Sequence, residues 1–466
     1  MSGNRSPVTI GIDVGTTATK AVAVDDSGSI LARSRRPHGL HFPAPGLIEH
    51  DADVAWRRGP LAAWADVCRA GVPQSACVAA MLPTLASVGA DGVPLGAGLL
   101  YGDARGEAVS GLPPVGNEEF VGFLRYLAGR HPDAAGFWPA QTVANFALAG
   151  RAALDTATAM AAVPLLGADG WDAERCAQLG VAPEQLPQLV AGWQPAGLVA
   201  GDALGVGSVA VPGEAGGVPL GAGIPDGLAE LAVAGAGEAG DVIVTLGSTL
   251  LCWVVTDSWL DVDGLWTIPH VVADRFCVGG PSNAGGLFWD RVRAMLGDPP
   301  PGEEFDAALA ALDPGDLPVW IPSVHPERTP VAGRARSASL LGLEATHRRA
   351  HLHRAALDAA GFVVRRHIEA AGTTPRRIVA TGGGTVVGPW TQALADCCDL
   401  PVYVGAVPES AALGAAFAAR LVAGLETDLA DGARWAATAR IVEPDPRWVG
   451  PCEARYQRFM TLLDGK

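Results

Sequence analysis

Residues 8–34 read VTIGIDVGTTATKAVAVDDSGSILARS and contain two strand signals separated by a tight turn. The segment begins as an apolar strand, passes a Gly-Thr-Thr turn, and continues as an alternating strand that ends in a second turn. Residues 241–263, DVIVTLGSTLLCWVVTDSWLDVD, repeat this arrangement, and residues 12–17 align with 244–249 without a gap. Two copies of one unit half a chain apart predict two related α/β domains with a working cleft between them.

The composition agrees with two folded domains. The chain has 466 residues, against roughly 100 to 200 per domain. Hydrophobic residues make up 49% and charged residues 18%, which excludes a disordered chain. The 49 acidic residues against 33 basic ones give a formal charge of -16, so nucleic acid would be repelled. The absence of an apolar run of ~18 residues and of a signal-peptide pattern predicts a cytoplasmic protein without a membrane segment.

The eight cysteines are scattered, with no CxxC pair and no histidine at metal-ligand spacing. We predict reduced, mostly buried thiols rather than a metal site.

Periodicity predicts the remaining elements. Helices are expected at 56–70, 118–130, 141–161 and 172–179, and short strands and turns at 201–222. The second half is expected to contain a helix at 346–372, a strand at 377–380, a glycine turn at 382–384, a helix from about 389, a strand at 401–404 and an Ala-rich helix at 410–425. The final 40 residues are interpreted as a peripheral extension that ends in an amphipathic helix around 456–463.

The two aligned turns are candidate phosphate sites. Consecutive backbone N–H groups and hydroxyls in such a turn can hold phosphate oxygens. A single turn of this kind also occurs in ordinary hairpins, and neither turn matches GxxxxGK[ST], so the pairing carries the hypothesis. The candidate residues are Gly15, Thr16 and Thr17 in the first turn and Gly247, Ser248 and Thr249 in the second.

Only the first copy carries an acid, Asp13, where the second has Thr245. A carboxylate beside a phosphate site predicts Mg²⁺ held through water, although a turn-capping role is the alternative. Lys20 can neutralise phosphate charge or simply be a solvated lysine on a strand.

Two further features are candidates for the site. Gly382-Gly383-Gly384 follows a strand and precedes a helix, which allows close approach of a ligand to the backbone. Asp226, in GAGIPDGLAEL, is either a helix N-cap or a carboxylate that takes a proton from an attacking hydroxyl.

In order along the chain, these motifs resemble those of the FGGY carbohydrate kinases, within the actin, hexokinase and Hsp70 fold group. The likeness covers essentially the whole chain. It is carried by IGIDVGTTATKAVAVDDSG, IPDGLAELAVAGAG, VTLGST, VGGPSNAGGLFWDRV, IPSVHPERTP, LLGLEATHRRAHLHRAALDAAGFVVR, IVATGGGTVVGPWTQALADCCDLPV and PESAALGAAFAA.

The resemblance implies two ribonuclease H-like (actin-like ATPase) domains with an interdomain cleft. Residues 1–228 would hold the sugar and the first phosphate motif, and residues 229–466 the second phosphate motif and the adenosine, with a C-terminal extension from about 430. The implied donor is ATP with Mg²⁺. Asp226 would be the catalytic base and Asp13 the metal residue, and the nucleotide would contact Gly15, Thr16, Thr17, Lys20, Gly247, Ser248, Thr249, Asn283, Gly383 and Gly384.

Within the family the nearest patterns are xylulokinase-like. LLYGDAR, residues 99–105, resembles the segment beside the sugar, which implies substrate roles for Tyr101 and Asp103. The alternative for Asp103 is pairing with Arg105 across a turn. The sequence departs from the xylulokinases at Leu82-Pro83, which replaces a Met-His pair before the sugar and so lacks an imidazole. Gln141-Thr142 replaces a Lys-Asp pair, and Val387 stands where the adenosine loop usually has a polar residue.

The leading hypothesis is ATP-dependent phosphorylation of a sugar or polyol hydroxyl. A gluconokinase, a ribulokinase and a tetritol or polyol kinase are alternatives within the family, and a nucleotide switch of the actin or Hsp70 type is the alternative from another class. The expected partner is a small molecule, and a homodimer is left open.

Overall fold

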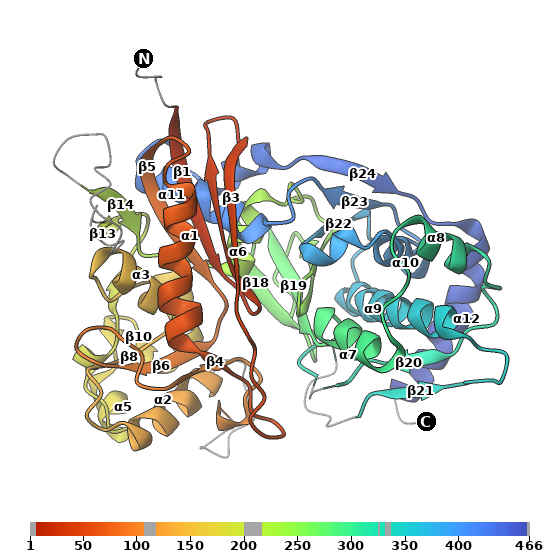
Figure 1. The fold of residues 1–466 in the computed structure, drawn as a ribbon, viewed down its shortest axis with the longest axis horizontal. Coiled ribbons are helices and arrows are strands. Elements are labelled where there is room, and N and C mark those ends of the chain that lie inside the picture. Colours follow the sequence, from red (N-terminus) through yellow and green to blue (C-terminus); the bar gives the residue numbers. More distant parts are fainter. Residues whose placement is uncertain (1–5, 107–117, 200–216, 325–326, 331–336, 464–466) are drawn as a thin grey trace. The chain divides into compact units, whose positions relative to one another are not determined.

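The computed structural model describes residues 6–106, 118–199, 217–324, 327–330 and 337–463 (Figure 1). The chain divides into two compact units. Unit 1 comprises Met1–Val233 and Ala411–Trp435, and unit 2 comprises Ala234–Ser410 and Ala436–Lys466. The sequence suggested two continuous domains, whereas a segment from late in the chain completes unit 1.

Unit 1 is built on a seven-stranded sheet. Its strands β1, β5, β14 and β15 run parallel, and β2, β3 and β13 are antiparallel to their neighbours. The order is β13 (Pro195–Val199), β14 (Val218–Gly221), β5 (Val72–Ala80), β1 (Pro7–Val14), β2 (Ala18–Val24) and β3 (Ile30–Pro37), with β15 (Ile224–Pro225) also paired to β5.

Smaller elements complete unit 1. An antiparallel sheet has the order β4 (Glu49–Asp51), β7 (Ala97–Leu100), β6 (Thr84–Val88) and β8 (Gly136–Trp138), and β9 (Ala153–Asp155) pairs with β12 (Gln188–Val190) and β10 (Leu166–Gly167) with β11 (Gly170–Trp171). The helices are η1 (Asp53–Arg58), α1 (Gly59–Val67), η2 (Ala104–Gly106), α2 (Glu118–Arg130), α3 (Ala140–Ala149), α4 (Thr156–Ala159), η3 (Met160–Ala162), α5 (Ala173–Gln178), η4 (Pro183–Gln185), α6 (Asp226–Val233), most of α11 (Ser410–Val422) and η6 (Leu429–Trp435).

Unit 2 repeats the sheet of unit 1. Its order is β18 (Trp266–Pro269), β19 (Phe276–Ser282), β17 (Leu250–Thr256), β16 (Asp241–Leu246), β22 (Arg377–Thr381), β23 (Val402–Gly405) and β24 (Thr438–Val442). The run β19-β17-β16-β22-β23 matches β3-β2-β1-β5-β14 strand for strand, with the same parallel and antiparallel pairs. The predicted duplication is therefore confirmed.

The helices of unit 2 pack around this sheet and the small hairpin β20 (Val319–Ile321) and β21 (Ser339–Leu341). They are α7 (Gly286–Leu296), α8 (Glu303–Ala310), α9 (Arg349–Ala371), η5 (Gly383–Val386), α10 (Gly388–Cys398) and α12 (Pro446–Leu463). The long helix, the 377–380 strand and the 401–404 strand lie where the sequence predicts them, within a few residues.

Close backbone approach explains why α11 joins unit 1. A Cβ atom added at Gly11 of β1 would lie 1.9 Å from the carbonyl oxygen of Ala412, and one at Gly414 would lie 1.9 Å from that of Ala229 in α6. Glycine is thus required at both contacts, because a side chain at Gly11 would separate α11 from the sheet and one at Gly414 would separate α11 from α6.

Two sequence expectations differ from the structure. The helix predicted at 141–161 is interrupted, because α3 ends at Ala149 and the next residue, Gly150, has a left-handed φ of 64° that closes the helix. The helix predicted at 56–70 begins as the π-helical η1 and becomes α-helical only at Gly59. Most of the 201–222 segment lies outside the described residues, and its end forms β14.

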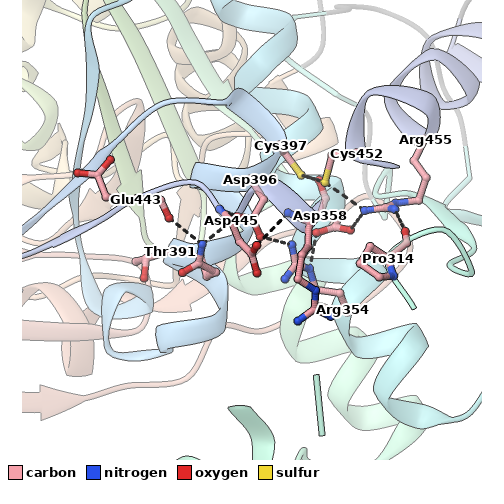
Figure 2. Close-up of polar contacts among 12 residues, drawn as sticks. Pro314, Arg354, Asp358, Thr391, Asp396, Cys397, Glu443, Asp445, Cys452 and Arg455 are labelled. Carbon is pink, nitrogen blue, oxygen red and sulfur yellow. Dashed lines mark hydrogen bonds and ion pairs between the residues drawn. The ribbon is translucent and has the colours of Figure 1, made fainter. Parts of the chain in front are cut away.

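The C-terminal segment is not peripheral to unit 2. Strand β24 pairs with β23, and Trp448, Cys452, Tyr456 and Phe459 of α12 are buried in the core. A buried network of ion pairs ties α12 to α9 and α10 (Figure 2). The extension predicted from about 430 is therefore wrong in this respect: the 436–463 stretch completes the core of unit 2.

Asp358 stands at the centre of this network (Figure 2). Its two carboxylate oxygens accept from Arg354 at 2.7 Å and from Arg455 at 2.9 Å. The Cys397 and Cys452 sulfurs are 3.7 Å apart beside it, and these three side chains bring possible metal ligands within 4.8 Å of one another. Since both carboxylate oxygens already serve arginines, we assign the cluster to packing of the helices rather than to a metal. All eight cysteines are free thiols.

In the described part of the chain, no helix combines the length and apolarity that crossing a membrane requires.

Candidate active site

Parallel strands of unit 1 bring Asp13 and Asp226 to the same edge of the sheet. Asp13 of β1 pairs with Ala79 of β5, and Ile224 of β15 pairs with Ala79 from the other side. Asp226 follows β15 directly and begins α6. Carboxyl ends of parallel strands share one edge, where ligands of α/β proteins commonly bind.

Asp226 lies in an environment that disfavours its charge. Burial, together with the negative charges of Glu230 and Asp13, raises the pKa of Asp226 to about 8. Part of its surface remains accessible. Its Oδ1 accepts from the N–H of Gly227 at 2.7 Å. A carboxyl group with this pKa can exchange a proton near neutral pH.

Two buried amides of α3 hold the segment that leads to Asp226. Gln141 Nε2 and Asn145 Nδ2 both donate to the carbonyl oxygen of Ala222, at 2.8 and 2.7 Å. Gln141 Nε2 also donates to Asp155 at 2.6 Å. Gln141, which was noted from the sequence as part of the replacement of a Lys-Asp pair, is fully buried and supports the strand before Asp226.

Asp13 is the second acid at this edge and is paired with Lys20. Burial raises the pKa of Asp13, and the ammonium group of Lys20 opposes this effect. Lys20 lies directly opposite Asp13 on β2, with Nζ 3.3 Å from Oδ2. In the second copy the corresponding cross-strand pair is Thr245 and Leu251, which carries no charge.

Two histidines donate hydrogen bonds to the backbone carbonyl groups of the first turn. His50 Nε2 donates to the carbonyl oxygen of Thr16 at 2.7 Å, because Trp56 donates to Nδ1 at 3.0 Å and so fixes the tautomer. The backbone N–H of His38 donates to the carbonyl oxygen of Thr17 at 3.1 Å. In a trans peptide the N–H points opposite to the C=O, so the N–H groups of Thr17 and Ala18 point away from these donors. That arrangement suits an anion.

The second turn is held in the same way by α7. The N–H groups of Gly286 and Leu287 donate to the carbonyl oxygens of Gly247 and Ser248 at 2.8 and 2.9 Å. The N–H groups of Ser248 and Thr249 therefore point away from α7. Gly285 and Gly286 make this contact possible, since a Cβ on either would lie within 3 Å of the turn backbone.

Tyr101 and Leu82-Pro83 border the first turn. The hydroxyls of Tyr101 and Thr16 are 2.7 Å apart. Met81, just before Leu82, donates its backbone N–H to the carbonyl oxygen of Val14 at 3.3 Å, and both Leu82 and Pro83 keep some exposure. These residues therefore lie at the same edge as Asp13.

The carboxylate of Asp103 accepts four hydrogen bonds from within the protein. Its Oδ1 accepts from the backbone N–H and from Nε of Arg105, both at 2.8 Å. Its Oδ2 accepts from Nη2 of Arg105 at 2.7 Å and from the N–H of Ile48 at 2.5 Å. Its side chain has no exposed area. A carboxylate offers about four acceptor positions, so these contacts leave none for a substrate hydroxyl, and the Arg105 alternative describes the observed geometry.

Asn283 directly follows β19 and precedes α7. Its backbone N–H donates to Glu327 Oε1 at 3.0 Å, and the Ser282 hydroxyl donates to Oε2 at 3.0 Å. Burial raises the pKa of Glu327 to about 7. Glu327 was not singled out from the sequence, because no motif distinguished it within IPSVHPERTP.

The glycines after β22 have two different roles: Gly382 and Gly384 pack against Leu246, and Gly383 faces open space. Gly382 has a φ of 87°, and a Cβ there would lie 2.8 Å from the carbonyl oxygen of Leu246. A Cβ at Gly384 would lie 2.8 Å from the Leu246 side chain. Gly383 is exposed, with open space around its Cβ position, so it is the residue a ligand can approach.

Comparisons with known proteins identify the family. Residues 8–79 match the N-terminal domain model of the FGGY family of carbohydrate kinases, and residues 244–423 match its C-terminal domain model. The glycerol kinase of Nocardia farcinica is 26% identical over 91% of this chain and 92% of its own length. A probable L-xylulose kinase of Pasteurella multocida is 24% identical over 97% and 98%.

The fold agrees with this family. The crystal structure of gluconate kinase from Lactobacillus acidophilus aligns with a TM-score of 0.77 at 21% identity, over 98% of both chains. The fold class expected from the motifs is thereby confirmed. Each of the two duplicated α/β units has a glycine turn between its first two strands, which agrees with this family. The chain belongs to the FGGY family of carbohydrate kinases and is an ATP-dependent enzyme acting on sugar or polyol hydroxyls.

Proposed function

We propose that this kinase transfers the terminal phosphoryl group of ATP to a hydroxyl of a neutral polyol or ketose, with Asp226 as the general base. The observation that carries the proposal is the delivery of Asp13 and Asp226 to one sheet edge, with the pKa of Asp226 raised to about 8. Asp226 would take the proton from the attacking hydroxyl, and phosphoryl transfer needs little more than that base, positioning and charge stabilisation.

The remaining residues have separate parts in the proposal. The outward N–H groups of the two turns would hold phosphate oxygens, and Gly383 would border the adenosine. The carboxylate of Asp13 would be a suitable ligand for Mg²⁺, because this ion binds one or two carboxylate oxygens and keeps several water molecules as its other ligands. When bound, Mg²⁺ neutralises charge on the phosphates. Lys20, beside Asp13, would add positive charge at the same place.

The charge of the site supports a neutral acceptor. The negative charges of Glu230 and Asp13 both act on Asp226, and Lys20 is the cation that acts on both aspartates. An aldonate would bring its own carboxylate next to these acids, and like charges in a partly buried site repel. We therefore place a ketopentose, as in a xylulokinase-like enzyme, or a short polyol such as glycerol or a tetritol ahead of gluconate.

A release assay for ADP tests the proposal. The purified chain is incubated with MgATP and, one at a time, glycerol, erythritol, D-xylulose, L-xylulose, ribulose and gluconate. ADP release that depends on a neutral acceptor, and that Asp226→Asn abolishes, is the expected result. Release that is equal without any acceptor would favour a nucleotide switch, and release with gluconate alone would refute the neutral-acceptor assignment.

A further inference from the structure

Residues 327–329 of unit 2 form a short segment whose ends are fixed by buried polar groups. At one end, the carboxylate of Glu327 accepts from the Asn283 N–H and the Ser282 hydroxyl, and from the N–H of Arg328 at 3.0 Å. Ser282 is the last residue of β19 and Asn283 precedes α7, the helix that holds the second turn.

Thr329 fixes the other end. It is fully buried, its N–H donates to the carbonyl oxygen of Pro281 at 3.2 Å, and its hydroxyl lies 2.8 Å from Nε2 of His367 in α9. The Thr329 hydroxyl also donates to the carbonyl oxygen of Pro281 at 2.9 Å, and His367 Nδ1 lies 2.8 Å from the carbonyl oxygen of Val363, so the histidine is itself held in place. A Cβ on Gly280 would lie 2.6 Å from the Thr329 methyl group, so glycine is needed there to admit the segment.

Between these anchors, the side chain of Arg328 extends to the second turn. Its Nη2 lies 3.5 Å from Oγ1 of Thr249. A guanidinium group is permanently charged and presents several N–H donors in a planar fork that matches phosphate oxygens. The fixed segment thus brings a cation to the turn whose Ser248 and Thr249 N–H groups point away from α7.

We propose that Arg328 is a phosphate-binding residue that acts with the second turn, and that Glu327 is the positioning residue that aims it. The proposal rests on the proposed function, because it takes ATP as the ligand. A purely structural role would make Arg328 a tie between the 327–329 segment and Thr249, with no effect on the nucleotide beyond a change in stability. Nucleotide affinity without acceptor separates the two roles.

The test is calorimetric titration of the full chain with Mg²⁺ and a nonhydrolysable ATP analogue. Arg328→Gln should weaken binding at least tenfold, and Arg328→Lys should fall between the parent and Arg328→Gln, because lysine keeps the charge but loses the fork. Arg293→Gln is the matched control, since Arg293 is a partly exposed residue of α7 that pairs with Asp290 and Asp298, and it should stay within twofold. Melting temperatures of all variants show whether each is folded.

A double-mutant cycle tests the role of Glu327. Glu327→Gln should weaken binding several-fold in the parent and add nothing in the Arg328→Gln background, because its effect passes through Arg328. Additive effects would overturn the positioning role. Arg328→Gln within twofold of the parent would overturn the phosphate role while leaving the kinase assignment intact, whereas a parent that binds no nucleotide would overturn the proposed function and this inference together.

Discussion

The ammonium group of Lys20 lies 3.3 Å from the carboxylate of Asp13, directly across the β1–β2 ladder. This pair exists only in the first of the two duplicated units, since the second has Thr245 and Leu251 at the matching positions. A charged cross-strand pair beside the turn is therefore found in unit 1 and is missing at the matching positions of unit 2.

Asp13→Asn should raise the Mg²⁺ concentration that gives half-maximal rate and lower the maximal rate, because an amide oxygen is a weaker ligand than a carboxylate. Steady-state rates at fixed ATP over a Mg²⁺ series measure this effect. Asp133→Asn, at an exposed position of unit 1, is the control and should leave the curve unchanged. An Asp13→Asn enzyme with the parental Mg²⁺ dependence would show that Asp13 only supports its turn.

Asp226→Asn should lower kcat by roughly 10²- to 10⁴-fold, the usual contribution of a general base, with nearly unchanged affinity for an ATP analogue. The amide keeps the shape of the side chain but cannot accept the proton. Turnover and analogue titration are measured on the same preparation, with Asp133→Asn again as control. Turnover within threefold of the parent would remove Asp226 from the assigned role.

The duplication could be predicted because its signals are local. Strand patterns and the aligned turns at residues 12–17 and 244–249 lie within short windows, and the structure has the same strand order around both turns. The return of α11 to unit 1 could not be predicted in this way. It depends on contact between Gly11 and Ala412, which are far apart in the sequence, and a glycine in a strand does not indicate which helix will approach it.

Residues of the candidate site could be predicted only where the residue type and its place in a motif indicate a chemical role. Asp13, Asp226 and the turn residues were selected in this way. Asp103 could not be assigned from the sequence, because an aspartate beside an arginine fits either a sugar ligand or an ion pair, and only the geometry shows four internal donors. Glu327 and His50 were missed because each acts through contacts with the backbone of a distant turn or strand end.

The pH dependence of the rate should follow Asp226. The base must be ionised to accept a proton, so kcat/KM should fall as the pH drops below about 8, the raised pKa of Asp226. Positive charge from Mg²⁺ beside Asp13 favours the ionised form, so the inflection in kcat should lie at a lower pH than that in kcat/KM. Rates from pH 5.5 to 9.5 measure both curves. A kcat/KM profile that is flat between pH 6 and 9 would contradict this prediction.

Asp226 should also lower the stability of the free enzyme at alkaline pH. Its folded-state pKa lies above the usual value, so folding favours the protonated form, and stability is lost as the pH rises toward and through about 8. Asp226→Asn should therefore melt at least about 4 °C above the parent at pH 9, and by a smaller margin at pH 5. Thermal unfolding with EDTA and without nucleotide tests this, and a larger margin at pH 5 than at pH 9 would refute it.

Asp103→Ala should lower the stability of the protein and have little effect on substrate binding. The change leaves Arg105 and the N–H of Ile48 without their shared acceptor, and loss of one partner from such a buried set costs on the order of 3 kcal/mol. We expect a matching decrease in the free energy of unfolding by urea, with the acceptor KM within about threefold of the parent once a substrate is found. Asp91→Ala, at an exposed turn, serves as the control. A tenfold rise in acceptor KM at parental stability would instead return Asp103 to the sugar-binding role suggested by LLYGDAR.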